Sequence, residues 1–163
     1  MNRGLHKNKG FTLIEILVAL LILTIGLLGI GGLQTKAQQY GRYSYLSTQA
    51  TVFGHDILER ARANPKGLLS GFYNKPNNQQ HASCYSLTGC SVQEMAENDM
   101  YEWHTKITST LPGGGSVICL DSTPNDGTPA ETACDGLGLI YAAKVWWKLP
   151  DGTDQRVVIT TAL

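Results

Sequence analysis

An uninterrupted apolar segment follows the first ten residues of the chain. It runs from Phe11 to Leu33, and Glu15 is its only charged residue. As a helix rising about 1.5 Å per residue, these 23 residues would span about 35 Å, which exceeds the roughly 30 Å of a bilayer's hydrocarbon core. The pattern therefore predicts a membrane-spanning helix with one carboxylate near its start.

A helical pattern continues beyond the apolar segment, but with one apolar stripe on an otherwise polar surface. The stripe steps by three or four residues and consists of Leu33, Ala37, Tyr40, Tyr43, Leu46, Ala50, Phe53, Ile57 and Ala61. It ends at Asn64–Pro65, because a residue before proline disfavours the α conformation. We therefore expect one helix from about residue 11 to about residue 63, half in the membrane and half outside. Its stripe is expected to pack onto a soluble domain.

The rest of the chain predicts a loop, a second helix and a small antiparallel sheet. Residues 65–90 are rich in Pro, Gly, Asn, Gln and Ser, which is typical of a loop. Ser91 and Glu94 have the spacing of a capping box, and a helical apolar pattern follows up to "PGGG" at 112–115.

Three later segments have the pattern of β-strands. They are "SVICL" (116–120), "LIYAAKVWWKL" (139–149) and "RVVITTAL" (156–163), with a turn at "PDGTDQ" and a loop at 121–138. In the second segment the large apolar side chains alternate with Lys144 and Lys148, which predicts an apolar face and an opposite face carrying both lysines. The fold class is therefore α+β.

Charge is distributed unevenly along the chain, although the formal net charge is zero. Arg3, Lys7 and Lys9 give the leader a charge of +3, which by the positive-inside rule places the N-terminus in the cytoplasm and the rest outside. A cleaved secretory signal is the alternative, but such signals have shorter apolar cores and a small-residue cleavage motif. From Leu33 onward, ten basic and twelve acidic residues leave about −2, so no nucleic-acid partner is expected.

All four cysteines lie in the expected exterior part: Cys84, Cys90, Cys119 and Cys134. In an oxidising compartment an even number indicates two disulfides, with three possible connectivities. Proximity along the chain favours Cys84–Cys90 and Cys119–Cys134. A metal site of His81 with Cys84 and Cys90 is the alternative, although its spacing is not that of a zinc knuckle. No metal and no cofactor are expected.

The stretch "KGFTLIEILVALLIL" resembles the class III signal of type IV pilins and pseudopilins. The resemblance implies that a prepilin peptidase removes residues 1–10 by cutting between Gly10 and Phe11, and then methylates Phe11. It also assigns Glu15 a role in assembly. The implied partners are other minor and major pilins, the peptidase, the inner membrane and the pilus assembly platform. The implied location is the inner membrane with a periplasmic C-terminal domain, and then the pilus.

Looser similarity extends over most of the chain. The segments "DILERARANP", "CYSLTGCS", "MAENDMYEWHTKITSTLPGG" and "VWWKLPDGTDQRVVITTAL" resemble PilV-type minor pilins, which help initiate pilus assembly. This similarity implies a leader (1–10), a transmembrane helix (11–33), its amphipathic continuation (34–64) and a pilin head (65–163). Major pilins often carry a proline in the distal transmembrane helix, whereas this chain has Gly26, Gly29, Gly31 and Gly32. Because glycine weakens a helix by about 1 kcal/mol relative to alanine, local unwinding there is plausible in a filament.

Glu15 is unusual because a charged side chain at bilayer depth costs roughly 2.5–3.5 kcal/mol on insertion scales. Cleavage before Phe11 would create an α-amine four residues before Glu15. In a stack of parallel helices, the carboxylate of one subunit would then meet the N-terminal ammonium of a neighbour. The alternative is an unpaired acid that reaches toward the lipid headgroups.

Other functions have weaker support in the sequence. His55 and Asp56 are adjacent on a helix and point apart, and no nucleophile motif surrounds His104, so the chain is not expected to be an enzyme. A DNA-binding pilin would use the cations Arg60, Arg62, Lys66 and Lys75, but Asp56 and Glu59 are interleaved with the first two. A type II secretion pseudopilin shares the leader and Glu15 and remains a further alternative.

Overall fold

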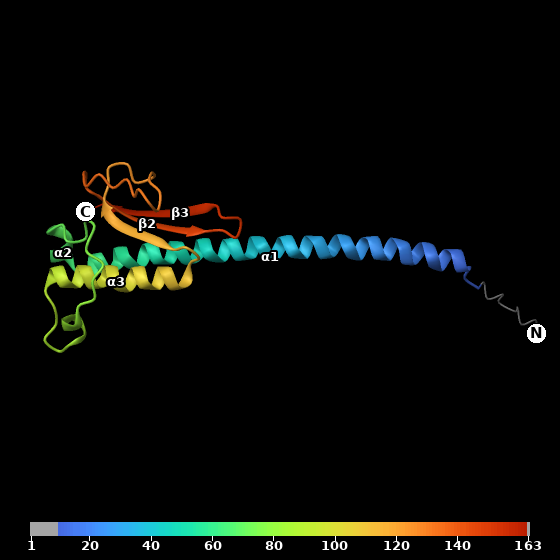
Figure 1. Cartoon of the computed structure of the whole chain (residues 1–163), viewed down its shortest axis with the longest axis horizontal. Helices are drawn as coiled ribbons and strands as arrows, with labels where there is room; N and C mark the ends of the chain where they lie inside the picture. The colour runs from blue at the N-terminus through green and yellow to red at the C-terminus, as the bar shows by residue number, and fades with distance from the viewer. Residues whose placement is uncertain (1–9, 163) are drawn as a thin grey trace, which may run out of the picture. The chain divides into compact units, whose positions relative to one another are not determined.

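The first helix is continuous from the apolar segment into the C-terminal part of the chain. In the computed structural model, which describes residues 10–162, helix α1 spans Leu13–Ala63 (Figure 1). This confirms the single long helix and its end before Asn64–Pro65. The chain divides into two units, residues 1–42 and residues 43–163. The second unit is called the head here.

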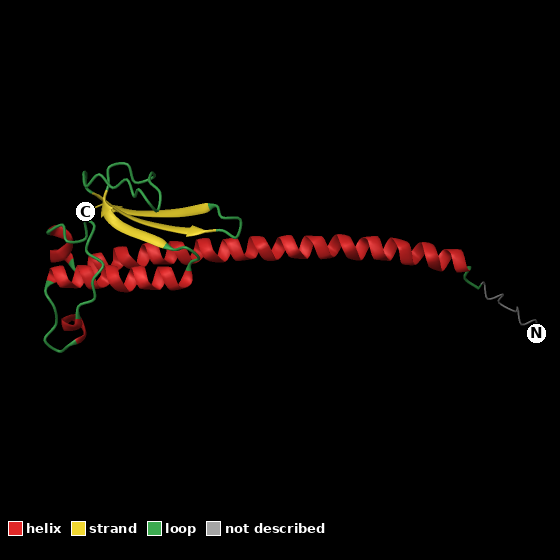
Figure 2. Ribbon diagram, in the orientation of Figure 1, coloured by secondary structure: helices red, strands yellow, loops and turns green. Residues whose placement is uncertain are grey.

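The head combines helices with one sheet (Figure 2). After α1 come α2 (Pro65–Leu69), the 3-10 helix η1 (Ala82–Tyr85) and α3 (Val92–Thr110). Three antiparallel strands follow in the order β1 (Gly115–Leu120), β2 (Ile140–Lys148) and β3 (Asp154–Ala162). The expected α+β fold is confirmed.

The sequence predicts a loop for residues 65–90, but the structure has two short helices within this range. Asn64 accepts a hydrogen bond from the Gly67 N–H at 3.2 Å, and Pro65 occupies the first turn of α2. Proline thus ends α1 and begins a new helix, because its fixed φ suits a first helical turn where its missing N–H is not needed. The second exception is η1, which contains Cys84.

The core lies between the head part of α1, helix α3 and one face of the sheet. The Trp103 indole N–H donates to the carbonyl oxygen of Phe53 at 2.8 Å and ties α3 to α1. The apolar stripe of α1 is buried here at Leu46, Ala50, Phe53, Ile57 and Ala61. Its earlier members Leu33, Ala37 and Tyr40 are exposed, so the prediction that the whole stripe packs onto the soluble domain is wrong for them.

Helix α3 begins as predicted. Ser91 caps it through the N–H of Glu94, and the Glu94 carboxylate accepts from the Ser91 N–H at 2.8 Å, which completes the capping box. The two hydrogen bonds satisfy backbone donors that a helix start leaves free.

A polar network joins α3 to α1. Arg60 donates to Asp99 and Glu102 at 3.2 and 2.8 Å and also pairs with Asp56, while the Tyr73 hydroxyl donates to Asp99 at 2.6 Å. Burial and the hydrogen bond to Asp99 raise the pKa of Tyr73.

Strand β2 is buried on both faces, which corrects the expectation that Lys144 lies on a simple polar face. Lys144 is fully buried under the 121–138 segment, and its Nζ lies 2.6 Å from Asp121 and 3.0 Å from Asp126. It also donates to the carbonyl oxygens of Asp126 and Thr132. A fully buried cation requires such partners, because moving a charge out of water without a counter-charge or hydrogen bonds costs much free energy.

Removing the Lys144 charge should destabilise the head strongly, because Asp121 would remain buried without a counter-charge. We expect Lys144→Met to lower the free energy of unfolding by roughly 3–5 kcal/mol. Lys144→Met with Asp121→Asn should recover part of this loss. Urea unfolding of the full chain in detergent with intact disulfides measures the effect. Lys148→Met, at an exposed lysine of the same strand, is the control and should change little.

Acid should weaken the contact between α1 and α3. The hydroxyl of Tyr85 and the guanidinium of Arg60 donate to Glu102 and lower its pKa below the ordinary 4.5. A carboxylate with a lowered folded pKa stabilises the fold above its unfolded pKa, and this contribution is lost as pH falls through the folded pKa.

Stability should therefore fall as the pH drops below about 4.5, and less steeply in Glu102→Gln than in the wild type. Denaturant unfolding across this pH range measures the difference. Glu131→Gln, at an exposed head glutamate, is the control. If the free energy of unfolding fell equally with pH in the wild type and in Glu102→Gln, the stabilising role of the Glu102 carboxylate would be contradicted.

Candidate functional site

The candidate site is the N-terminal end of the described chain. Gly10, Phe11 and Thr12 precede the first helical residue, Leu13. The predicted cleavage bond Gly10–Phe11 therefore lies in non-helical, exposed chain, where a peptidase could bind it in an extended conformation. The predicted leader cations Arg3, Lys7 and Lys9 lie outside the described residues.

The apolar part of α1 exposes its side chains on every side. All residues from Gly10 to Arg42 are exposed, and α1 is long and apolar enough to cross a membrane. A contiguous apolar surface of this size is not stable in water and indicates a membrane or protein environment. Length and composition together fit membrane anchoring.

Glu15 lies in the first turn of α1. Its backbone N–H donates to the Thr12 carbonyl oxygen at 3.1 Å, in the first turn of the helix. The partial positive charge at a helix N-terminus favours a carboxylate in this turn. Within residues 10–162, no ion pair is formed by Glu15. The carboxylate is therefore available to a cation from outside the described chain.

The side chains around Glu15 form a shallow concave surface. Residues at four-residue steps share one helix face, and this surface is lined by Phe11, Glu15, Ile16, Ala19, Leu20 and Leu23. Ala19 is small, so a neighbouring helix could approach this face closely. The charge and the residue that would carry the new amine thus lie on the same face.

The glycines of the apolar segment do not interrupt the helix. Gly26, Gly29, Gly31 and Gly32 all lie inside α1, and the Thr35 hydroxyl donates to the Gly31 carbonyl oxygen at 3.2 Å. Nothing lies within 4 Å of a Cβ built at any of the four. The structure thus shows helix where unwinding was considered plausible for a filament.

The four cysteines form Cys84–Cys90 and Cys119–Cys134, the pairing that proximity along the chain favoured. Because both sulfurs of Cys84 and Cys90 are joined, they offer no thiolate for the metal site considered with His81. Cys119, Asp121 and Cys134 also lie close together, but there too the two sulfurs are bonded to each other.

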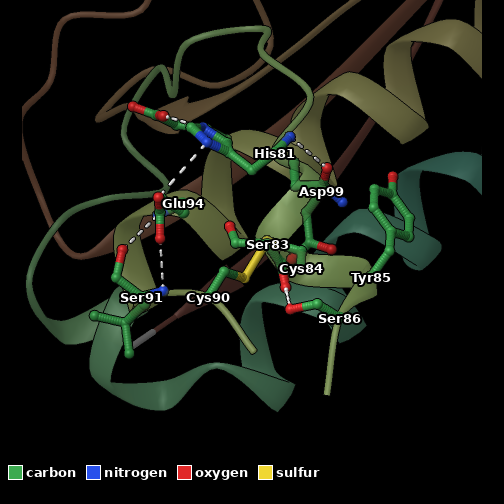
Figure 3. The surroundings of a disulfide bond; sticks show 12 residues. His81, Ser83, Cys84, Tyr85, Ser86, Cys90, Ser91, Glu94 and Asp99 are labelled. Atoms are coloured by element: carbon green, nitrogen blue, oxygen red, sulfur yellow. Dashed lines mark hydrogen bonds and ion pairs between the residues drawn. A yellow bond between two sulfur atoms is a disulfide. The ribbon is translucent and has the colours of Figure 1, made fainter. Parts of the chain in front are cut away.

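His81 instead holds the first disulfide loop on α3 (Figure 3). Its Nε2 lies 2.6 Å from a Glu97 carboxylate oxygen, and its backbone N–H donates to Asn98 at 3.0 Å. Tyr85, inside the disulfide loop, donates to Glu102 at 2.7 Å. Although burial opposes it, the hydrogen bond from His81 helps to lower the pKa of Glu97. These contacts, which sequence reasoning missed, fix the loop.

His104 and three of the four cations considered for DNA binding have structural partners, whereas His55 is exposed. His104 Nδ1 lies 2.9 Å from the Ser116 hydroxyl oxygen, but among the described residues no carboxylate bonds its other ring nitrogen. Of the cations considered for DNA, Arg60 binds α3, Arg62 pairs with Glu59 and donates to Thr161, and Lys75 donates to the Cys134 carbonyl oxygen. Lys66, the fourth, is exposed and has no side-chain partner among the described residues, so three of the four cations are already engaged.

Comparison with known proteins bears on the same N-terminal segment. Residues 5–31 match the family model of the prokaryotic N-terminal methylation motif. No curated protein and no solved structure matches the chain. The matched segment contains Gly10, Phe11 and Glu15, and the motif implies processing by a prepilin peptidase and assembly with other pilins. The methylation motif, the apolar helix and the α+β head together support a type IV pilin-like or pseudopilin precursor.

Proposed function

We propose that the protein is a structural minor pilin of the PilV type, which helps to initiate a type IV pilus after a prepilin peptidase has removed residues 1–10. The observation that carries the proposal is Glu15, a carboxylate without an ion pair in the described chain, inside an exposed apolar helix that bears the methylation motif. The PilV-type and minor-pilin assignments rest on the looser similarity of the head segments.

The proposed chemistry at the site is the creation of a counter-charge. Hydrolysis of the Gly10–Phe11 bond adds water across the amide and gives a Gly10 carboxylate and a Phe11 ammonium. A methyl group on that nitrogen leaves it able to carry a proton. In a bundle of parallel helices, the ammonium of one subunit lies near the Glu15 of another, and the pair forms where the dielectric constant is low and the attraction strong.

The head has a structural role in this proposal and performs no catalysis. The protein is held in the inner membrane by α1, with the head on the periplasmic side, before it enters the filament. Oxidation of all four cysteines is consistent with that compartment.

A minor pseudopilin of a type II secretion system is the second candidate, because the same methylation motif and Glu15 favour it equally. Neighbouring genes distinguish the two: pilus-assembly genes support the pilin, whereas secretion genes support the pseudopilin. A DNA-binding pilin is less favoured, since Arg60, Arg62 and Lys75 already have partners in the head.

Processing is the first test. Intact-mass analysis of protein purified from membranes of its own bacterium should show loss of residues 1–10 and one added methyl group on Phe11. The reason is that the non-helical Gly10–Phe11 bond precedes α1. A mature chain that starts near Gly32 would instead indicate an ordinary signal peptide and would contradict the pilin assignment.

Glu15 provides the second test. Glu15→Ala removes a charge that is costly in the bilayer, so the membrane level of the protein should hold or rise, and the head should fold unchanged. Incorporation into sheared filaments should fall. Glu15→Gln keeps the shape and deletes the charge, so it should behave like Glu15→Ala if the ion pair matters.

Glu131→Gln is the matched control, because Glu131 is an exposed head residue, and it should be incorporated normally. Wild-type incorporation of Glu15→Gln would show that a neutral hydrogen bond suffices, and the ion-pair mechanism would be wrong.

A further inference from the structure

The two edges of the head sheet differ in how their backbone groups are used. In an antiparallel pair, residues alternate between those that bond the neighbouring strand and those whose N–H and C=O point away. The Asp121 N–H donates to the Ile140 carbonyl oxygen at 3.1 Å, so even-numbered residues of β2 bond toward β1 and odd-numbered ones toward β3. The bond from Leu149 N–H to the Thr153 carbonyl oxygen, just beyond β2 and β3, agrees with this alternation, because Leu149 is odd-numbered and bonds on the β3 side.

The C-terminal half of the β1 edge is bonded by other parts of the head. The Ile118 carbonyl oxygen accepts from the Lys75 N–H, and the Leu120 carbonyl oxygen accepts from the Gly136 N–H, both at 3.0 Å. The Leu120 N–H donates to the Asn74 side chain, also at 3.0 Å. Of the outward backbone groups of Ser116, Ile118 and Leu120, the Ile118 carbonyl and both groups of Leu120 therefore have partners within the described chain.

The edge of β3 is open. The register pairs Lys144 with Val158, so the N–H and C=O groups of Arg156, Val158 and Thr160 point away from β2. In the part of the chain that the structure describes, these outward backbone groups make no hydrogen bond. Val158 is half-buried and Thr160 is exposed.

This edge also lacks the usual protection against strand pairing. Natural edges carry charges, prolines or bulges, or are covered by another element. Residues 157–162 contain no charge and no proline, and the pairing with β2 runs without a bulge over nine residue pairs. The guanidinium of Arg156 is turned away from the edge onto the carbonyl oxygens of Asn125 and Gly127, both at 2.7 Å.

We infer that the β3 edge binds an extended, uncharged segment of a different pilin-type subunit, which joins the sheet as a fourth strand. Main-chain hydrogen bonds to Arg156, Val158 and Thr160 would hold it, as in other cases of β-strand addition. An uncharged partner strand fits because the edge offers no charge to pair with from Val157 onward. The inference rests on the proposed function, which supplies such neighbours.

The direction of α1 argues against antiparallel pairing with β3 of a second copy of the chain. The head part of α1 runs in the same direction as β3 (Figure 1). Three contacts in order along both elements show this. They are Ser47 with Gln155 in one groove, Gly54 with Ile159, and the hydrogen bond from Arg62 to Thr161. Antiparallel pairing of two β3 edges would reverse one head relative to the other, and with it the head part of α1. Two chains anchored through the same end in one membrane could not pair in this way.

A proline at the edge tests the inference in the full chain in its own bacterium. Val158→Pro removes an N–H that β2 does not use, and proline is tolerated on edge strands, so the head should remain folded. Incorporation into filaments should fall on the order of tenfold, because the partner strand loses a hydrogen bond and meets the proline ring. Val158→Thr keeps the N–H and the β-branched shape and should behave as the wild type.

The outcomes separate the two proposals. An unprocessed wild-type chain, or one absent from filaments, contradicts the proposed function. If the wild-type chain enters filaments and a folded Val158→Pro variant enters them at the same level, strand addition is overturned. If Val158→Pro unfolds, Thr160→Pro applies the same test at the exposed outward position.

Hydrogen exchange gives a readout that does not depend on a variant. In the full chain in detergent, the amides of Val157 and Ile159 should already be slow, and those of Val158 and Thr160 fast. In sheared filaments, Val158 and Thr160 should become slow, which gives an alternating pattern specific to a new strand. Unchanged exchange at these two amides would overturn the inference.

A photo-crosslinking residue at Thr160 identifies the occupant. A cross-link to an extended segment of another pilin-type subunit supports the inference. A cross-link to β3 of a second copy, or none in assembled filaments, overturns it.

Discussion

The single carboxylate of Glu15 is the main physical constraint on the apolar N-terminal part of α1. It lies in the first turn of a helix whose surrounding residues are apolar and exposed, and it forms no ion pair among the described residues. In hydrocarbon such a charge requires a partner, and the cleavage proposed above would form an amine at Phe11, four residues before it. In the proposed function, the same residue connects membrane insertion, processing and assembly.

The head depends on a different set of interactions. Apolar packing joins α1 to α3 and the inner face of the sheet, while the polar network around Arg60 fixes how α3 lies on α1. The two disulfides fasten the segments that contain little regular structure. Other parts of the head bond the β1 edge at the Ile118 carbonyl oxygen and at both backbone groups of Leu120, whereas the β3 edge has no such partner among the described residues.

Much of the fold could be predicted from local patterns. The long apolar helix, the part of its stripe from Leu46 onward, the capping box at Ser91 and the positions of the strands follow from short-range chemistry, and the structure confirms them. α2 was missed because Asn64–Pro65 both ends one helix and caps another. The burial of Lys144 was missed because strand alternation says nothing of a loop that covers the outer face.

The candidate site shows the same division. Gly10, Phe11 and Glu15 could be singled out because they lie within one short motif. The contacts of His81, Arg60 and Lys144 join residues that are far apart in the sequence, and no spacing rule indicates them. The unequal edges of the sheet likewise follow from register, which the sequence does not provide.

The covering segment 121–138 is held by contacts that are largely indifferent to its side chains. Lys144, Arg156 and Lys75 donate to the carbonyl oxygens of Asp126, Thr132, Asn125, Gly127 and Cys134, and every amino acid carries such an oxygen. The side chains needed in addition are the carboxylates of Asp121, Asp126 and Asp135 and the disulfide of Cys134. Substitutions at exposed positions of this segment, such as Glu131 and Leu137, should therefore leave the covering of Lys144 intact.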